Sequence, residues 1–239
     1  MADSDKSLDI FGTKPLSEAA KVASEATVHG IGEFLSRICL PAAEEFGLLL
    51  RDKVSAWRET NLIAIAAMAK EIMEAKGQPT GQHAHPRIVG GILEHGSWSD
   101  DDKVRGMWAG LLASACTANG KAQENLIYVN YLAQITTSQA KILNFACEEA
   151  TKKKSKYGLL LAEHYSCPIS QVSLVSGNDD LHAIDLELDH LRSLGLLDTD
   201  SGLRFDDATN AVLTPSALGL QLYVRCQGYV GSPTEYFGL

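Results

Sequence analysis

Positive charge is in short supply in this chain of 239 residues, which has 21 lysines and arginines against 30 aspartates and glutamates. The formal net charge is −9. Such a surface is repelled by phosphate backbones and anionic lipid unless basic residues gather on one face. Long apolar runs are missing too, since none approaches the about 18 residues of a membrane-spanning helix, and no signal-like leader opens the sequence. We therefore expect a cytoplasmic protein with no transmembrane segment.

Cysteine is also scarce, and its placement argues against disulfides and zinc fingers. The five residues are widely spaced and form no Cys-x-x-Cys pair: Cys39, Cys116, Cys147, Cys167 and Cys226. An odd number of isolated cysteines is typical of reduced thiols in a cytosolic protein. We expect most of them to pack as small hydrophobic side chains in helices.

Familiar catalytic motifs are absent as well. The chain contains no phosphate-binding GxxxxGK[ST] loop, no GxSxG and no HExxH. Gly30-x-Gly32-x-x-Leu35 is a broken dinucleotide fingerprint, because the third glycine is missing and the preceding residues have a helical pattern. We expect no enzyme, no catalytic residue and no cofactor, although a site assembled only in three dimensions escapes this test.

Three groups of polar residues have the composition of a metal site without its spacing. They are His83, His85 and His95; His164 with Cys167; and Asp100, Asp101 and Asp102. Zinc sites normally show four ligands in paired spacing, and a magnesium site needs further carboxylates nearby. The aspartates follow Ser99, and Ser99-x-x-Asp102 resembles the capping box of a helix. We therefore expect no metal site in this chain.

What is present is a mainly α-helical pattern. Residues 1–13 are expected to be flexible, and residues 14–136 to form a helical domain with a linker at 77–86. Its main feature is one very long helix, Ala42 to Lys76, of roughly 50 Å. Apolar positions recur along it every three or four residues in an 11-residue repeat: Phe46, Leu50, Val54, Trp57, Asn61, Ile65, Met68 and Ile72. A rod of that length needs the rest of the chain or a second copy to cover its stripe.

The last third of the sequence has a different pattern of expected elements. A helix Thr137–Lys154, a short apolar segment and a helix Leu181–Leu194 precede a two-stranded hairpin around 208–210 and a closing helix. This order predicts a winged-helix-like domain at 137–228, followed by a tail at 229–239 that docks through Tyr229, Tyr236 and Phe237. The predicted fold is thus mainly α, with a small two-stranded β-hairpin.

The helix that would read DNA in a winged helix is acidic here. Its inward positions are Ile184, Leu188, Leu191 and Leu194, and its outer positions include Asp185, Glu187 and Asp189. Residues 179–207 contain nine acids and two arginines. Base readout and phosphate contact need the opposite charge, so we interpret Asp185, Glu187 and Asp189 as a face that binds a protein partner.

One basic run offers an alternative. Lys152, Lys153, Lys154 and Lys156 fall at the expected end of the helix Thr137–Lys154, where cations offset the helix dipole. We favour the interpretation that these lysines form a solvated helix end. The functional alternative is that they make weak contacts with nucleic acid.

Several stretches resemble the bacterial abortive-infection family called Abi-alpha. They include "GLLLRDKVSAWRETNL", "HPRIVGGILEHGSWSDDDKVRGMWAGLLASA" and "YVNYLAQITTSQAKIL", with the closing "LRSLGLLD…LTPSALGLQLYVRCQG". The likeness covers most of residues 40–228 and transfers no catalytic residues. It implies a phage-defence protein, which we expect to act without catalysis through protein–protein contacts or self-assembly. A winged-helix nucleic-acid-binding regulator or sensor and a membrane-active effector remain alternatives.

Overall fold

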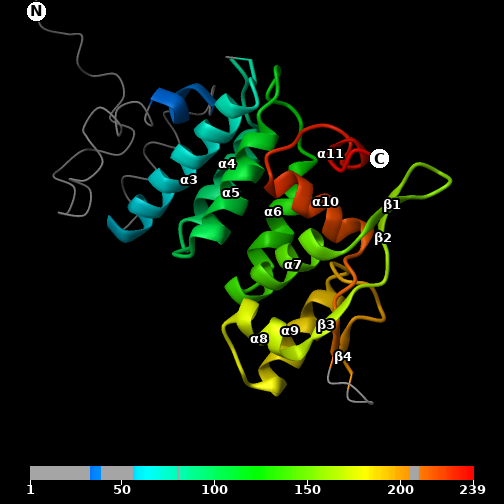
Figure 1. Ribbon diagram of the computed structural model, residues 1–239. Helices are drawn as coiled ribbons and strands as arrows, with labels where there is room; N and C mark the ends of the chain where they lie inside the picture. Colours follow the sequence, from blue (N-terminus) through cyan, green and yellow to red (C-terminus); the bar gives the residue numbers. More distant parts are fainter. Residues whose placement is uncertain (1–32, 39–55, 80, 205–209) are drawn as a thin grey trace, which may run out of the picture. The chain divides into compact units, whose positions relative to one another are not determined.

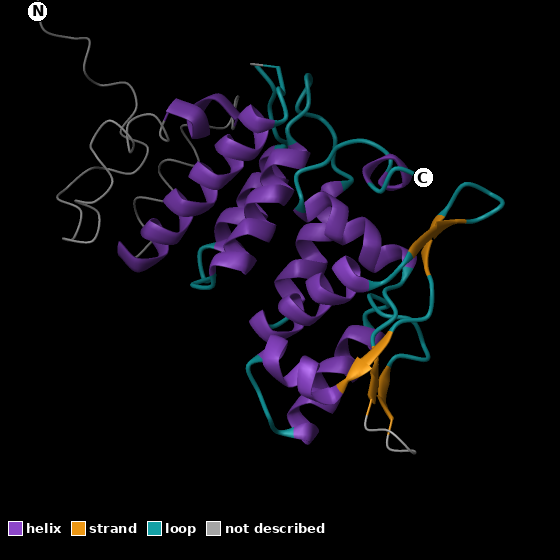
Figure 2. Ribbon diagram, viewed as in Figure 1, coloured by secondary structure: helices purple, strands orange, loops and turns teal. Residues whose placement is uncertain are grey.

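The computed structural model describes residues 33–38, 56–79, 81–204 and 210–239 and is mainly helical with small antiparallel sheets (Figures 1 and 2). Two compact units divide the chain, Met1–Asn130 and Tyr131–Leu239. The predicted flexible start at 1–13 and the incomplete glycine motif at 30–35 lie wholly or mostly outside the described residues. Cys39 lies outside them too.

The first unit contains three helices that pack on one another, α3 (Ala56–Ala75), α4 (Pro86–Gly96) and α5 (Asp102–Ala115). Of the expected long helix, only its second half is described, as α3; residues 42–55 lie outside the described part. The predicted stripe is confirmed only in part. Asn61 and Ile65 are buried, but Met68 and Ile72 are half-buried and Trp57 is 47% exposed. The buried face also includes Leu62, Ala66, Ala69 and Met73. The alanines let α3 approach α5 closely, so the buried face is centred on small side chains that a search for large apolar residues overlooks.

α5 begins differently from the prediction. The carboxylate of Asp101 accepts hydrogen bonds from the backbone N–H groups of Lys103 (3.0 Å) and Val104 (3.3 Å), and is therefore the N-cap. The predicted capping box of Ser99 and Asp102 is wrong. Asp101 is the last residue with extended backbone, and Ser99 instead accepts a hydrogen bond from Trp108 Nε1 at 3.1 Å.

Within the expected linker at 77–86, His83 and Ala84 are held by hydrogen bonds to two other segments. His83 forms an isolated antiparallel bridge with Thr117. Its Nδ1 donates to the carbonyl of Arg37 at 2.7 Å, and the N–H of Ala84 donates to Ile38 at 2.9 Å. His85 then caps α4, since its ring nitrogen accepts from the N–H of Arg87.

The boundary between the units falls within α6 (Asn125–Gln134), and α7 (Thr137–Glu149) is the first helix wholly inside the second unit. The order continues with β1 (Lys152–Lys154), β2 (Leu160–Ala162), β3 (Ser166–Pro168), α8 (Ile169–Ser176), α9 (Leu181–Ser193), β4 (Gly202–Arg204), β5 (Asn210–Val212), α10 (Ala217–Cys226) and α11 (Pro233–Tyr236). α7 starts with a capping box of Thr136 and Gln139, one residue before the expected cap.

One prediction about this unit is wrong and another is incomplete. The helix expected to end at Lys154 ends at Glu149, because Ala150 adopts an extended backbone and the lysines form strand β1, paired antiparallel with β2. The two strands of the expected hairpin pair antiparallel, as β4 and β5, but β3 also pairs with β5, so the sheet has three strands in the order β3-β5-β4. Its third strand was missed because Ser166–Pro168 is short and opens directly into α8.

The core of the second unit joins α7, α9 and α10. Leu143, Ile184, Leu188 and Leu191 are fully buried, which confirms three of the four inward positions predicted for α9; the fourth, Leu194, is half-buried. Gly219 lets α10 approach the preceding loop, since a Cβ there would lie 2.2 Å from the carbonyl oxygen of Leu196.

The predicted docking of the tail is confirmed. The rings of Tyr229 and Tyr236 meet at 5.5 Å, and Phe237 stacks on Tyr223 of α10 at 6.2 Å. The side chain of Arg225 donates to the carbonyl of Tyr229 at 2.6 Å. These contacts hold α11 against α10 within the same unit.

Candidate interaction surface

α9 is the element whose outer side was predicted to bind a partner. Asp180 caps its first turn by accepting from the N–H of His182 at 3.0 Å. The inward leucines and isoleucine of α9 are buried and fix the helix on the core. After the helix, Gly195, at φ 69°, turns the chain toward β4. The helix therefore presents a fixed outer face.

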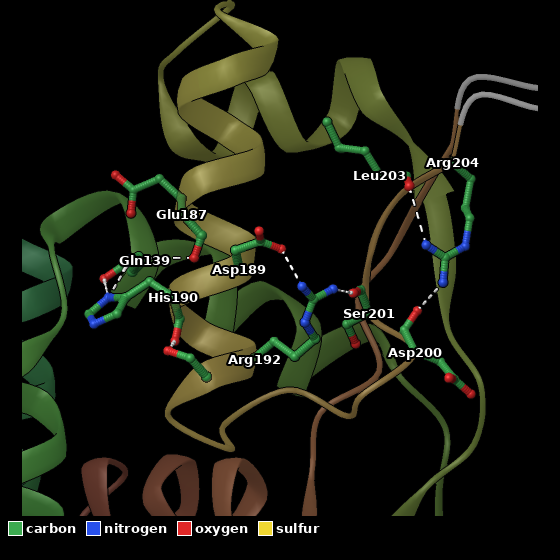
Figure 3. A network of polar contacts seen from close by, with 10 residues as sticks. Gln139, Glu187, Asp189, His190, Arg192, Asp200, Ser201, Leu203 and Arg204 are labelled. Carbon is green, nitrogen blue, oxygen red and sulfur yellow. Dashed lines mark hydrogen bonds and ion pairs between the residues drawn. The ribbon is translucent and has the colours of Figure 1, made fainter.

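Internal contacts use two of the three predicted partner-binding acids, Glu187 and Asp189, and Figure 3 shows the contact of Asp189. The hydroxyl of Thr136 donates to Glu187 Oε2 at 2.8 Å. Arg192 Nη2 donates to Asp189 Oδ1 at 2.6 Å. Asp185 is exposed, and the described residues offer it no hydrogen bond or ion pair. The carboxylate available to a partner at this face is therefore chiefly that of Asp185.

The polar side chains around α9 form a network that braces it against α7 and the loop before β4 (Figure 3). The amide of Gln139 lies 2.9–3.1 Å from His190 Nδ1 and donates to the carbonyl of Glu187 at 3.3 Å. Arg192 Nη1 donates to the carbonyl of Ser201 at 2.9 Å, and Arg204 donates to the carbonyls of Asp200 and Leu203. Both arginines of this region are thus engaged with the protein's own backbone, where they brace the fold.

Sequence reasoning missed an apolar feature of the same surface. Leu186 points outward from α9 with 71% of its area exposed, Leu181 at the start of the helix is 41% exposed, and Leu174 on α8 is 82% exposed. Helical spacing was a usable signal for Leu186, because it falls outside the stripe of Ile184, Leu188 and Leu191. An exposed apolar patch rimmed by polar residues marks a protein-binding surface.

Most of the negative charge predicted for residues 179–207 lies on residues that the structure describes. Residues 179–204 carry seven acidic side chains and two arginines, a net of −5. Burial raises the pKa of Asp198, and the neighbouring Asp200 raises it further. Like charges therefore crowd the loop before β4, and a phosphate group is repelled there.

The four lysines do not lie at a helix end as predicted, but on the β1–β2 hairpin. Lys152 still reaches the end of α7, because its Nζ donates to the carbonyl of Glu148 at 2.8 Å, and it lies 5.0 Å from the ring centre of Phe237. Lys153 pairs with Glu163 at 3.9 Å. Lys154 and Lys156 are exposed near the turn, and the Nζ of Lys156 lies 4.9 Å from the ring centre of Tyr157.

Several of the histidines and aspartates considered as metal ligands make structural contacts. His83 and His85 bind backbone groups, and Asp101 caps α5. Within the described ranges, no group of three or more His, Cys, Asp or Glu side chains has the arrangement of a metal site. Burial raises the pKa of the Cys147 and Cys226 thiols, which keeps them protonated and weakly nucleophilic.

A second exposed patch, on the first unit, also escaped prediction. Trp57 and Trp98 lie with ring centres 6.1 Å apart and are 47% and 60% exposed. The guanidinium of Arg58 stacks 4.4 Å above Trp98 and donates to Ser97 Oγ at 2.8 Å. Buried Asn61 connects this cluster inward, donating to the carbonyl of Ser97 and accepting from Arg105 Nη1 at 2.9 Å. The "WRETN" and "GSWSDDDKVR" stretches therefore fold into one polar and aromatic junction between helices.

No helix in the described part of the chain combines the length and the hydrophobicity that crossing a bilayer requires. No curated protein and no solved structure matches the chain. The sequence model of the family described as abortive infection alpha matches residues 60–217, which include Trp98, α7, the β1–β2 hairpin and α9. The match spans more than half of the 239 residues, so the chain belongs to the abortive infection alpha family.

Proposed function

We propose that this protein defends bacteria against phage by abortive infection, and that it acts without catalysis by binding another protein surface. The observation that carries the proposal is the family match over residues 60–217. The outer face of α9 supports the mode of action, because it combines the exposed Leu186 with the exposed carboxylate of Asp185.

The element order of the second unit supports a winged-helix-like shape for this surface. Apart from the β1–β2 hairpin, which lies between α7 and β3, the order along the chain is α7, β3, α8, α9, β4 and β5, and the three strands β3, β4 and β5 form one antiparallel sheet. In DNA-binding winged helices the helix at the position of α9 enters the major groove. Here that helix carries acids and leucines, and its only arginine binds Asp189 and the carbonyl of Ser201. We infer that the shape serves protein recognition.

Infection of cells that express the protein tests the proposed function. Cells with and without the protein are infected at two ratios, with few phages per cell and with many. Abortive infection predicts that the culture survives at the low ratio and collapses at the high ratio, because infected cells die without releasing phage. Equal phage yields with and without the protein, over a panel of unrelated phages, would contradict the proposal.

A further inference from the structure

The β1–β2 hairpin has a turn whose shape is fixed by its own hydrogen bonds. Ser155 accepts at its hydroxyl from the N–H groups of Tyr157 and Leu159, at 3.3 and 3.0 Å. The backbone adds bonds from Ser155 to Leu159 (2.8 Å) and from Gly158 to Ser155 (2.9 Å). Gly158 has a φ of 83°, a conformation that other residues adopt rarely. A side chain on this turn is thus presented at little further cost in entropy.

This turn, residues 154–159, is called the hairpin tip below. It joins positive charge to exposed apolar area: Lys154 and Lys156 are exposed, Tyr157 is 79% exposed and Leu159 is 61% exposed. In a chain with a net charge of −9, this is a local concentration of cations. Tyrosine and leucine beside lysine match a partner that is acidic and apolar at once.

The α8–α9 face has that complementary chemistry. It consists of Leu174, Leu181 and Leu186 with the exposed carboxylates of Asp179 and Asp185. Asp185 follows Leu181 by one helical turn and adjoins Leu186, so acid and leucine alternate over the outer side of α9. Both surfaces belong to the same unit, Tyr131–Leu239.

The two surfaces lie apart within that unit. Figure 1 shows the loop of the β1–β2 hairpin projecting away from the helices, while α8 and α9 lie at a distant end of the unit. The hairpin tip therefore does not cover the α8–α9 face of its own chain. A complementary pair of surfaces that cannot meet within one molecule can meet between two copies.

We propose that the hairpin tip of one copy docks on the α8–α9 face of a second copy. This deepens the proposed function, on which it rests, by naming the partner as the chain itself. The contact joins two different surfaces, so a pair of copies keeps one free face on one copy and one free tip on the other. Association of this kind continues into closed rings or open filaments.

Charge complementarity favours a second copy over nucleic acid or a membrane. A phosphate surface that met Lys154 and Lys156 would be repelled by the rest of the acidic chain. The α8–α9 face satisfies both the cations and the apolar side chains of the tip.

Sedimentation velocity on the full chain tests the proposal through two charge-reversed variants. The tip variant carries Lys154→Glu and Lys156→Glu, and the face variant carries Asp179→Lys and Asp185→Lys. We expect the weight-average mass of the wild type to rise with concentration from 25.8 kDa to roughly twice that or more, as a repeating contact requires. High salt weakens this association, because its charges are exposed. Each variant alone should stay at 25.8 kDa.

Sedimentation of a mixture of the two variants is the decisive measurement. The face variant keeps a native tip and the tip variant keeps a native face, so the mixture should associate although neither variant does alone. A contact between two tips predicts instead that the face variant associates alone, and a contact between two faces predicts that the tip variant does. Either of those results overturns the proposal. Circular dichroism confirms that both variants are folded.

Two further results would overturn the proposal and identify the alternative partner. One is a wild type that remains a single chain at roughly 100 µM, far above the Kd of a 1 µM contact. The other is binding of random duplex DNA, or of vesicles of anionic phosphatidylglycerol, that the tip variant alone loses. Phage protection by a wild type that does not associate would overturn this inference and leave the proposed function standing. Association without protection in any infection would do the reverse.

Discussion

Gly219 is the residue where the chain leaves least room for a side chain. A Cβ at this position would lie 2.2 Å from the carbonyl oxygen of Leu196, a backbone atom that cannot rotate away. Nearby, the N–H of Ser216 donates to the same carbonyl at 3.1 Å and its hydroxyl donates to Gly195. α10 is thereby held at the end of the loop that follows α9.

Gly219→Ala is expected to destabilise the second unit by about 2 kcal/mol or more, because α10 must shift to admit the methyl group. Gly106→Ala is the matched control, since Gly106 is also helical and a Cβ there meets nothing within 4 Å. That control should gain about 0.5–1 kcal/mol, from the higher helix propensity of alanine. Urea unfolding measures both; equal effects would show that α10 does not approach Leu196 so closely.

Asn61 is a second residue whose role is visible only in three dimensions. It belonged to the predicted apolar stripe and is indeed buried, at 2% exposed. Its side chain, however, makes hydrogen bonds with the carbonyl of Ser97 and with Arg105. Asn61→Leu should cost about 1–3 kcal/mol, because buried groups of Ser97 and Arg105 lose their partner. Thermal denaturation checks this against Ile63→Leu, a change at a half-buried position of the same helix. A leucine variant as stable as the wild type would contradict the network.

At the scale of single elements, sequence periodicity was sufficient for α9 and insufficient for the β1–β2 hairpin. The spacing of Ile184, Leu188 and Leu191 identified a buried face because a helix repeats every 3.6 residues. The lysines of β1 have no such period, and a basic run after a helix suits either a helix end or a solvated strand. Only their pairing with Leu160–Ala162, a contact across a turn, decides for the strand.

The candidate surface, too, was predicted only in part from the sequence. Asp185 was recognised from its outward position, but the partners of Glu187 and Asp189 come from Thr136, 51 residues away, and from Arg192. The exposed leucines were overlooked because apolar residues were assigned to the core by default. The contact of Thr136 leaves no local pattern in the sequence because it crosses a long stretch of chain. The pair of Asp189 and Arg192, at i and i+3 of one helix, was a usable local signal.

The positions of Asp185 and Asp189 on α9 predict how their replacement affects stability and DNA binding. Asp185→Lys should leave stability within about 0.5 kcal/mol, because the carboxylate is exposed and has no partner among the described residues. Adding Asp189→Lys should lower it by about 0.2–1 kcal/mol, the usual contribution of an exposed ion pair such as that with Arg192. The double variant should bind duplex DNA more tightly than the wild type in a low-salt anisotropy titration. Unfolding of the double variant would mean that these residues face inward.

At the scale of the second unit, pH dependence follows from its buried thiols and phenols. Burial raises the pKa of Tyr165 from 10.0 to about 12, and it also raises the pKa of Tyr223, Cys147 and Cys226. An acid whose folded-state pKa is raised contributes its full stability below the unfolded-state pKa and loses it as pH rises. The contribution is therefore complete below pH 9.0 and decreases toward pH about 12.

Melting temperatures across that alkaline range check the sign. They should decrease as pH rises, and Tyr165→Phe should make the decrease shallower because it removes one titrating group. Tyr157→Phe, a change at an exposed tyrosine, is the matched control. Melting temperatures that increase between pH 9.0 and pH 12 would contradict the burial of these groups.

At the scale of the whole molecule, the account holds that a member of the abortive infection alpha family defends through the outer side of α9 and performs no chemistry there. The most direct measurement is the plating efficiency of a sensitive phage on cells that express the wild type, Leu186→Lys or Ile127→Lys at equal levels. Both variants replace an exposed apolar side chain by a cation, 71% exposed in one case and 55% in the other. The account predicts that Leu186→Lys loses protection while Ile127→Lys retains it. Full protection by a folded Leu186→Lys protein would contradict the claim that this surface carries the function.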